Sequence, residues 1–232
     1  MGNKIGVIGG MGPMASQLFY RMVTERTAAA SDQEHVEMVI LSDTEMPDRT
    51  QAILNHRYEE VAERLLEDAL TLQGCGCKGI AITCNTAHFF VDMIADQIQI
   101  PIVHMIRETA KALAESCRGE TAAILATDGT IKTGLYQKAL ETEGVNAYTL
   151  SPPNQENLMH EIYDCIKSGK PCDVAAWRMI ERELEENHCK KAILACTELS
   201  VIKDEQGLDD RYADPLEILA DRVIALSGHI VK

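Results

Sequence analysis

Two short stretches of this chain end in the same way, and they constrain its fold more than any other feature. Residues 79–83 and 191–195 are mostly apolar runs that favour buried strands, and they lead directly into Cys84 and Cys196. Small polar residues follow both cysteines. The two cysteines lie 112 residues apart, and the same offset places Cys77 on Cys189. This repeat predicts two similar halves, each of which offers one thiol to a shared cleft.

Predicted strands and helices alternate along the whole chain, which is typical of parallel sheets joined by right-handed crossovers. We therefore expect an α/β fold with two pseudo-symmetric domains, each a parallel-rich sheet flanked by helices. The predicted strands cover residues 4–10, 36–41, 79–83, 100–103, 121–126, 145–150 and 191–195. The predicted helices cover residues 14–26, 58–73, 85–96, 106–116, 131–143, 157–167 and 174–187, and two more begin after Cys196 and at Asp214. Residues 43–51 are predicted as a loop and residues 127–130 as a turn.

A second internal similarity sets the expected domain boundaries. Residues 8–12 resemble residues 125–129, since both lead from a strand into a glycine-containing turn. We expect the first domain to span residues 1–98, the second to span residues 99–208, and residues 209–232 to return as a helix onto the first. Open α/β sheets bind ligands at the carboxyl ends of their strands, so the active site is expected in the cleft between the domains.

The charge and cysteine content limit the classes of partner. The chain has 232 residues, with 36 acidic against 22 basic side chains and a net charge of −14, which disfavours nucleic acid and anionic membranes as partners. A small anionic substrate remains compatible with this charge. We expect no secretory signal and no transmembrane helix. Eight cysteines without such a signal indicate reduced thiols and a cytoplasmic location.

Two thiols that face each other across a cleft suggest a specific chemistry. A thiolate can remove a proton from one face of a carbon while a thiol returns a proton to the other face, and this inverts a stereocentre. Amides at the helix starts after Cys84 and Cys196, together with the hydroxyls of Thr86 and Thr197, are expected to stabilise the charge that develops.

The motifs around these cysteines resemble a known family. Residues 83–88 (TCNTAH) and 195–198 (ACTE) resemble the aspartate/glutamate racemase superfamily, and residues 9–13 (GGMGP) and 47–49 (PDR) look closest to its aspartate racemase branch. The resemblance covers nearly the whole chain. It implies a two-base amino-acid racemase, most closely one for aspartate, that needs no cofactor and no metal and that usually forms a homodimer.

The resemblance also implies roles for individual residues. Cys84 and Cys196 match the two acid/base residues, and Arg49 matches a residue tied to the distal carboxylate of aspartate. The residues matched to the amino-acid end of the substrate are Asn85, Thr86, Thr197 and Glu198. The residues matched to the lining of the cleft are Met11, Thr127 and Thr130. Lys167 resembles a second cationic residue of the branch.

Several of these side chains also have ordinary structural explanations. Arg49 lies in a predicted loop, where a solvated arginine is common. A lysine at the end of a helix, such as Lys167, also complements the helix dipole. For His88 and His104, we favour a structural role over a catalytic one.

Alternative functions remain open within and outside this class. Within it, the chain is a glutamate or broad-specificity racemase, or a relative similar to maleate isomerase or to a decarboxylase. A non-catalytic amino-acid-binding protein on the same fold is a further alternative.

Two motifs suggest other functions. The glycine turn at residues 9–13 nearly fits a dinucleotide-binding fingerprint, although Pro13 lacks an amide donor and this function leaves the cysteine repeat unexplained. Cys75 and Cys77 suggest a metal or redox site, but a single residue separates them, which is too few for a usual zinc pair.

Overall fold

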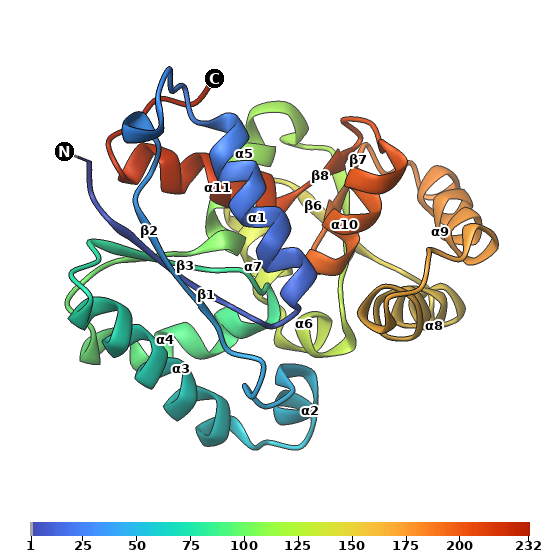
Figure 1. Ribbon diagram of the computed structural model, residues 1–232. Helices are drawn as coiled ribbons and strands as arrows, with labels where there is room; N and C mark the ends of the chain where they lie inside the picture. The colour runs from blue at the N-terminus through green and yellow to red at the C-terminus, as the bar shows by residue number, and fades with distance from the viewer. Residues whose placement is uncertain (1) are drawn as a thin grey trace.

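The computed structural model describes residues 2–232 and contains two separate four-stranded sheets (Figure 1). Along the first sheet the strand order is β2-β1-β3-β4, and along the second it is β6-β5-β7-β8. All neighbouring strands are parallel. The two sheets therefore repeat one topology, and the predicted two-fold α/β organisation is confirmed.

The structure fixes the bounds of each element. The strands are β1 (Ile5–Gly9), β2 (Met38–Ser42), β3 (Gly79–Ile82), β4 (Ile102–Val103), β5 (Thr121–Leu125), β6 (Asn146–Thr149), β7 (Lys191–Leu194) and β8 (Tyr212–Ala213). The α-helices are α1 (Pro13–Arg26), α2 (Arg49–Leu54), α3 (Tyr58–Gly74), α4 (Val91–Ile94), α5 (Met105–Cys117), α6 (Asp128–Thr133), α7 (Leu135–Thr142), α8 (Pro152–His160), α9 (Val174–Glu186), α10 (Thr197–Gln206) and α11 (Pro215–Leu226). The 3₁₀ turns are η1 (Asp32–Glu34), η2 (Thr86–Phe90), η3 (Ala95–Gln97) and η5 (Ile166–Ser168), and η4 (Glu161–Cys165) is a π-helix.

The strands β1, β3, β5 and β7 are buried on both faces, so the molecule has three apolar layers. In β5, Ala123 and Leu125 point into a central core, whereas Ala122 and Ile124 point into an outer core with α5 and α7. On the first sheet an outer core forms beneath α3. Alternate residues of one strand pack in different cores because successive side chains point to opposite faces of the sheet.

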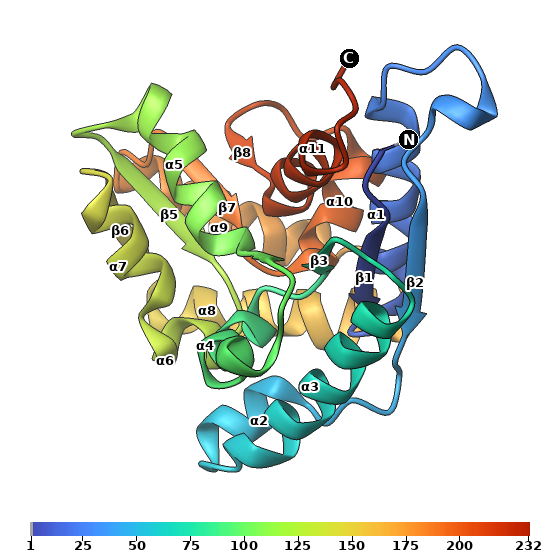
Figure 2. The same ribbon diagram turned by 90° about the vertical axis from the view of Figure 1, so that its left-hand side faces the viewer.

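The central core is shared by the two sheets. It joins residues of β1 and β5 to the apolar faces of α1, α10 and α11, and Figure 2 shows α10 and α11 between the sheets. Helix α11 begins as predicted, because the Asp214 side chain accepts a hydrogen bond from the Leu216 amide at 2.8 Å and Pro215 occupies the first turn. The placement of α11 brings the end of the chain back over the first sheet.

Local structure departs from the sequence predictions in several places. The predicted helix at residues 131–143 is divided into α6 and α7, and the predicted helix at residues 157–167 is the end of α8 followed by η4 and η5. The predicted loop at residues 43–51 contains the start of α2, which Asp48 caps, and the predicted turn at residues 127–130 opens α6, which Thr127 caps. The predicted helix after Cys84 is instead a series of short elements, η2, α4 and η3, and the Asn85 side chain does not cap the first of them. Strand β8 was not predicted, since two residues carry too little periodicity.

Sheet membership extends past the predicted domain limits. Strand β4 pairs with β3 in the first sheet although it follows residue 98, and β8 pairs with β7 in the second sheet although it follows residue 208. The division at residues 98 and 208 stays a prediction. Within residues 2–232, none of the helices combines the length and apolar character needed to cross a membrane.

Candidate active site

Cys84 and Cys196 line the same small cavity between the two sheets. Cys84 follows β3 and Cys196 follows β7, so both thiols lie at the carboxyl ends of their sheets, where parallel α/β proteins bind ligands. The two side chains are 6% and 7% exposed. The cavity has about 290 Å³ of empty space. Both thiols therefore face one small cavity that residues of both halves line.

Hydrogen bonds between the two halves close this cavity. The Thr197 hydroxyl donates to the Thr83 carbonyl at 3.3 Å, which ties the segment after one thiol to the segment before the other. The Thr86 hydroxyl lies 3.2 Å from that of Thr127, and Thr50 donates to Thr127 at 3.2 Å. Thr86, Thr127 and Thr197 therefore line the same cavity as the two thiols.

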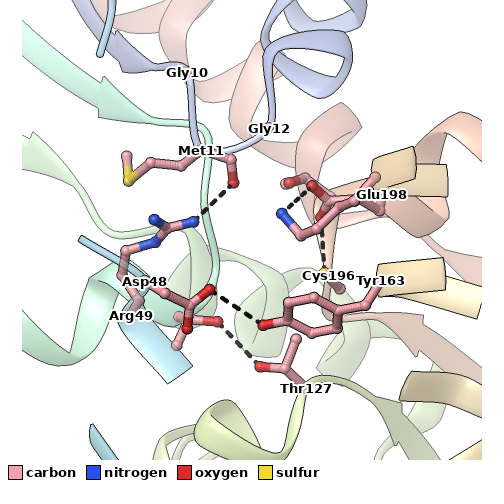
Figure 3. Close-up of polar contacts among 12 residues, drawn as sticks. Gly10, Met11, Gly12, Asp48, Arg49, Thr127, Tyr163, Cys196 and Glu198 are labelled. Carbon is pink, nitrogen blue, oxygen red and sulfur yellow. Dashed lines mark hydrogen bonds and ion pairs between the residues drawn. The ribbon is translucent and has the colours of Figure 1, made fainter. Parts of the chain in front are cut away.

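Glu198 connects the Cys196 thiol to a cation. The Cys196 thiol donates to Glu198 Oε2 at 2.9 Å, and Lys167 Nζ lies 2.7 Å from Glu198 Oε1 (Figure 3). Burial and the Glu198 carboxylate raise the pKa of Cys196 well above its usual range. Burial lowers the pKa of Lys167, but the Glu198 carboxylate outweighs it and holds this pKa above its usual range. Cys196 is therefore a protonated thiol at neutral pH, beside a Lys167 ammonium.

Arg49 is the cation on the Cys84 side. Its Nη1 atom donates to the carbonyls of Met46 and Pro47, and its Nη2 atom donates to the Met11 carbonyl at 3.3 Å (Figure 3). Burial lowers the pKa of Arg49, but the nearby Cys84 sulfur and the Asp48 carboxylate outweigh it and raise this pKa. Within residues 2–232 its buried Nε has no partner. Three of its five N–H donors are used, so two remain, enough for both oxygens of a carboxylate.

The cavity has further lining residues that the sequence did not indicate. Asp48, Thr50 and Tyr163 line it together with the predicted Met11, Asn85 and Lys167. The Tyr163 hydroxyl lies 3.5 Å from Asp48 Oδ2, so α2 and the π-helix η4 meet across the cavity (Figure 3). Burial raises the pKa of Tyr163 to about 12, so its hydroxyl remains a hydrogen-bond donor. Asp48 lies in the motif at residues 47–49, although no role was assigned to it, whereas no sequence signal identifies Thr50 or Tyr163, because their proximity arises from the packing of distant segments.

Thr130 does not line the cavity, which corrects the prediction for this residue. It is 1% exposed, and its hydroxyl lies 2.8 Å from that of Thr86. Because Thr130 is on the first turn of α6, its side chain points back behind Thr127 and supports the hydroxyls that reach the cavity.

The two histidines are outside the cavity and have structural partners. His88 Nδ1 lies 2.9 Å from the Cys84 carbonyl, and the Met105 amide donates to His88 Nε2 at 3.1 Å. Burial lowers the pKa of His88, so the ring is neutral and donates through Nδ1. His104 caps α5, and burial with neighbouring His88 lowers its pKa to about 3. His88 therefore holds the backbone of Cys84 rather than exchanging protons with substrate.

Gly12 and Gly129, which align in the internal repeat, each allow a close approach by the opposite half. A Cβ atom on Gly12 would lie 2.5 Å from Glu198 Oε1, and a Cβ atom on Gly129 would lie 2.8 Å from Thr50 Cα. The turn at residues 9–13 is thus filled by a carboxylate of the second half. A carboxylate there repels the phosphates of a dinucleotide, which argues against that alternative.

A larger groove opens beside the cavity. It has about 780 Å³ of empty space and shares Met11, Arg49, Lys167 and Glu198 with the cavity, while Met14 and Met46 add an apolar wall. Other hollows, such as one of about 780 Å³ between α5 and α7, contain neither thiol.

A metal site is not formed by the described residues 2–232, where no three His, Cys, Asp or Glu side chains are placed to hold an ion. The suggested Cys75 and Cys77 pair is split, since Cys75 is exposed and Cys77 is buried.

Comparisons with known proteins agree on one family. A family model described as Asp/Glu/Hydantoin racemase matches residues 8–223. The broad specificity amino-acid racemase RacX of Bacillus subtilis is 26% identical over 227 residues, which cover 95% of this chain and 96% of the relative. The structure of Picrophilus torridus aspartate racemase is similar with a TM-score of 0.81 and 28% identity, covering 100% of this chain and 96% of that one. An aspartate racemase homologue from Pyrococcus horikoshii OT3 shares the fold, with a TM-score of 0.77 and 24% identity over 97% and 99% of the two chains.

Proposed function

Because this chain belongs to the Asp/Glu/hydantoin racemase family and is an amino-acid racemase of that family, we propose that it interconverts L- and D-aspartate by a two-thiol mechanism. One observation carries the proposal: Cys84 and Cys196, from equivalent positions of the two halves, line one enclosed cavity. We propose that the reaction needs neither pyridoxal phosphate nor a metal ion.

The proton balance of the proposed reaction follows from the charges around the thiols. The Cys84 thiolate, with Arg49 as its counter-ion, removes the α-proton from one face of the substrate. The Cys196 thiol then donates its proton to the opposite face, which leaves a Cys84 thiol and a Cys196 thiolate. The reverse reaction begins from that second state. Glu198 holds the Cys196 thiol in its protonated form before turnover, since it accepts the thiol hydrogen bond.

The charge pattern of the cavity supports a dicarboxylic amino acid. Arg49 has two free N–H donors and Lys167 supplies a second cation, which together complement two carboxylates. We propose that Arg49 binds the distal carboxylate, as the motif match implies, and that Lys167 assists. Asn85, Thr86 and Thr197 supply uncharged donors for the amino-acid end, and Glu198 supplies a carboxylate for the ammonium group.

The developing charge at the α-carbon needs fixed donors in a dry site. The small enclosed volume excludes bulk water, and the hydroxyls of Thr86 and Thr197 are buried donors beside the thiols. The amide dipoles of α10 contribute on the Cys196 side. On the Cys84 side η2 is too short to contribute a comparable dipole, so side-chain donors carry that task.

A second candidate is a glutamate or broad-specificity racemase. RacX, whose printed name is that of a broad specificity amino-acid racemase, aligns with nearly the whole chain. The groove beside the cavity also offers space for longer side chains beyond Arg49. One methylene changes binding by only about 1–3 kcal/mol, so a related substrate remains competitive.

The experiment incubates reduced, dialysed protein with L-aspartate and with D-aspartate in heavy water, without pyridoxal phosphate or metal. The expected result is that optical rotation decays to zero from both sides while deuterium enters the α-carbon. Glutamate, alanine, serine and maleate follow as a panel. Turnover of maleate or one-sided exchange identifies an isomerase or decarboxylase relative, and saturable binding without proton exchange identifies an amino-acid-binding protein.

The proposal extends to location and assembly. We propose a cytoplasmic homodimer, which rests on the reduced cysteines and on the family resemblance. Sedimentation equilibrium of the purified protein tests the assembly, and a mass of twice 25.6 kDa is expected.

A further inference from the structure

The hydroxyl group of Tyr136 makes a contact that the mechanism above does not use. Tyr136 belongs to α7 in the second half and is fully buried. Its phenol donates to Asn85 Oδ1 at 2.5 Å. Asn85 belongs to the first half, directly follows Cys84 and is 2% exposed. A buried phenol of one half thus holds the amide of the residue next to a thiol of the other half.

This contact fixes which way the Asn85 amide faces. A phenol has one proton to donate, and the carbonyl oxygen of the amide receives it. The amide nitrogen Nδ2 must then point away from Tyr136. It is buried and has no hydrogen-bond partner within residues 2–232, while Asn85 lines the cavity. Tyr136 therefore fixes the orientation of the two N–H donors of Asn85, and both lack an acceptor within residues 2–232.

The acceptor must come from a ligand. An unpaired buried donor is costly, so its persistence in the folded protein indicates a group that pairs with it only when bound. An amino acid offers two kinds of charged group. Its ammonium group has only donors and is repelled by an amide N–H, whereas a carboxylate has only acceptors. The chemistry of the site thus selects a carboxylate as the partner of Asn85.

We propose that Tyr136 is a positioning residue, which orients Asn85 so that the amide donates to a carboxylate of the substrate. The inference rests on the proposed function, since the carboxylate belongs to the amino acid. Without the phenol, the amide can rotate by half a turn about its bond to Cβ and present its oxygen. The oxygen would face a carboxylate and repel it, so Tyr136 acts on substrate binding through Asn85.

A purely structural role for Tyr136 makes a different prediction. Its ring packs in the outer core with Ile124 and Leu140, and phenylalanine preserves that packing. Tyr136→Phe therefore isolates the hydroxyl. Tyr212 provides a matched control, because it is 4% exposed and its hydroxyl donates to Glu181 Oε1 at 3.0 Å, away from the cavity. Tyr212→Phe removes a part-buried hydrogen bond of a tyrosine hydroxyl at a site that does not contact Asn85.

The experiment compares wild type, Tyr136→Phe, Tyr212→Phe, Asn85→Ala and the double variant Tyr136→Phe/Asn85→Ala. Steady-state racemisation gives KM and kcat for aspartate, and calorimetric titration gives the aspartate dissociation constant independently of turnover. We expect Tyr136→Phe to raise KM and the dissociation constant about tenfold with a smaller change in kcat, as for one hydrogen bond to a charged group. Tyr212→Phe should change neither. In the Asn85→Ala background, Tyr136→Phe should raise KM and the dissociation constant for aspartate by less than about twofold.

Each outcome decides the inference. It is overturned if Tyr136→Phe behaves like Tyr212→Phe, or if its effect on binding is undiminished in the Asn85→Ala background. If Tyr136→Phe does not fold, the Asn85→Asp variant is measured instead. This variant keeps the oxygen that accepts from Tyr136, but a carboxylate oxygen takes the place of the amide nitrogen that would donate to the substrate. Unchanged aspartate binding by that variant would overturn the inference. If wild type binds aspartate without turnover and Tyr136→Phe weakens that binding, the proposed function is refuted and the role of Tyr136 is not. If wild type does not bind aspartate, both are refuted.

Discussion

Cys84 and Cys196 occupy equivalent positions in the two halves, yet their surroundings carry opposite charge. Each follows the third strand of its sheet order, β3 or β7. After Cys84 the chain forms the short turn η2, and the nearby charged side chain is Arg49. After Cys196 the chain forms the regular helix α10, and the thiol donates to Glu198. The backbone is nearly symmetric, and the charged side chains are not.

This difference shows how a repeated fold can hold two equivalent thiols in unequal electrostatic surroundings. The strand order places two thiols at one cavity, while α2 carries Arg49 on the Cys84 side and α10 carries Glu198 beside Cys196. The proposed two-thiol mechanism needs one thiolate and one thiol at each moment. In that proposal the helices around the sheets determine the starting state, and the sheets determine the geometry. The predictions below test each side of this comparison.

The largest effect is expected when either thiol is removed. Cys84→Ser and Cys196→Ser should each lower the racemisation rate of aspartate by at least about 10³-fold, because a hydroxyl is a far weaker acid and base for this step. Circular dichroism should show the native fold for both variants. Cys189→Ser, which alters a buried cysteine outside the cavity, is the control and should retain activity. Near-normal turnover by either site variant would refute the two-thiol mechanism.

Arg49 is the next strongest test, on the Cys84 side. Arg49→Ala should lower kcat/KM for aspartate by roughly 100-fold, because a charge-assisted pair of hydrogen bonds is lost. The loss for alanine or serine should be much smaller, since these substrates lack a distal carboxylate. The measurement is kcat/KM for all three amino acids with both enzymes. Equal losses for the three would remove Arg49 from the distal carboxylate.

Glu198→Gln tests the surroundings of Cys196, and the structure defines the direction in which the pKa of this thiol should change. The Glu198 carboxylate raises the pKa of Cys196, so its removal should lower that pKa, and the released Lys167 ammonium should lower it further. The Cys196 thiolate should then form at lower pH than in wild type. The pH dependence of alkylation by iodoacetamide, followed by mass spectrometry of the peptide that contains Cys196, measures this shift. We expect racemisation to fall about tenfold. A pH midpoint that is unchanged or higher would contradict the role of Glu198.

The smallest effects are expected at the two glycines. Gly129→Ala should lower the free energy of unfolding by about 1–3 kcal/mol, because the new Cβ meets the backbone of Thr50, which cannot move alone. Gly12→Ala should cost less stability, because its Cβ meets the end of the Glu198 side chain, which can rotate away from Lys167. It should instead lower kcat. Thermal unfolding and steady-state kinetics of both variants distinguish these outcomes, and equal stability losses would contradict the distinction.

The sequence predicts those parts of the molecule that depend on local pattern. The apolar run before Cys84, the Asp214 cap with Pro215, and the repeat that pairs Cys84 with Cys196 all have such signals, and they indicated two similar α/β halves without indicating the order of the strands. Tertiary packing overrides such signals elsewhere. Asn85 is of a residue type that caps helices, but its side-chain oxygen accepts from Tyr136 and not from the backbone, and the segment after Cys84 forms short irregular elements.

The parts of the site that the sequence did not predict are contacts between residues that lie far apart in the sequence. Tyr163 and Asp48 meet across 115 residues, and Thr50 and Thr127 meet across 77 residues. Neither pair has a spacing or motif that marks it, because their approach depends on how α2 packs against the second half. Single residues with the right chemistry were predictable, and the partners that orient them were not.

The shared central core also governs how the protein loses its structure. Since α1, α10 and α11 bury their apolar faces against both sheets at once, neither sheet can separate without exposing that layer to water. The two halves should accordingly melt in one cooperative transition, with equal calorimetric and van't Hoff enthalpies. Slowly exchanging amides should occur in β1 and β5 alike, so the repeated architecture behaves as a single unit of stability.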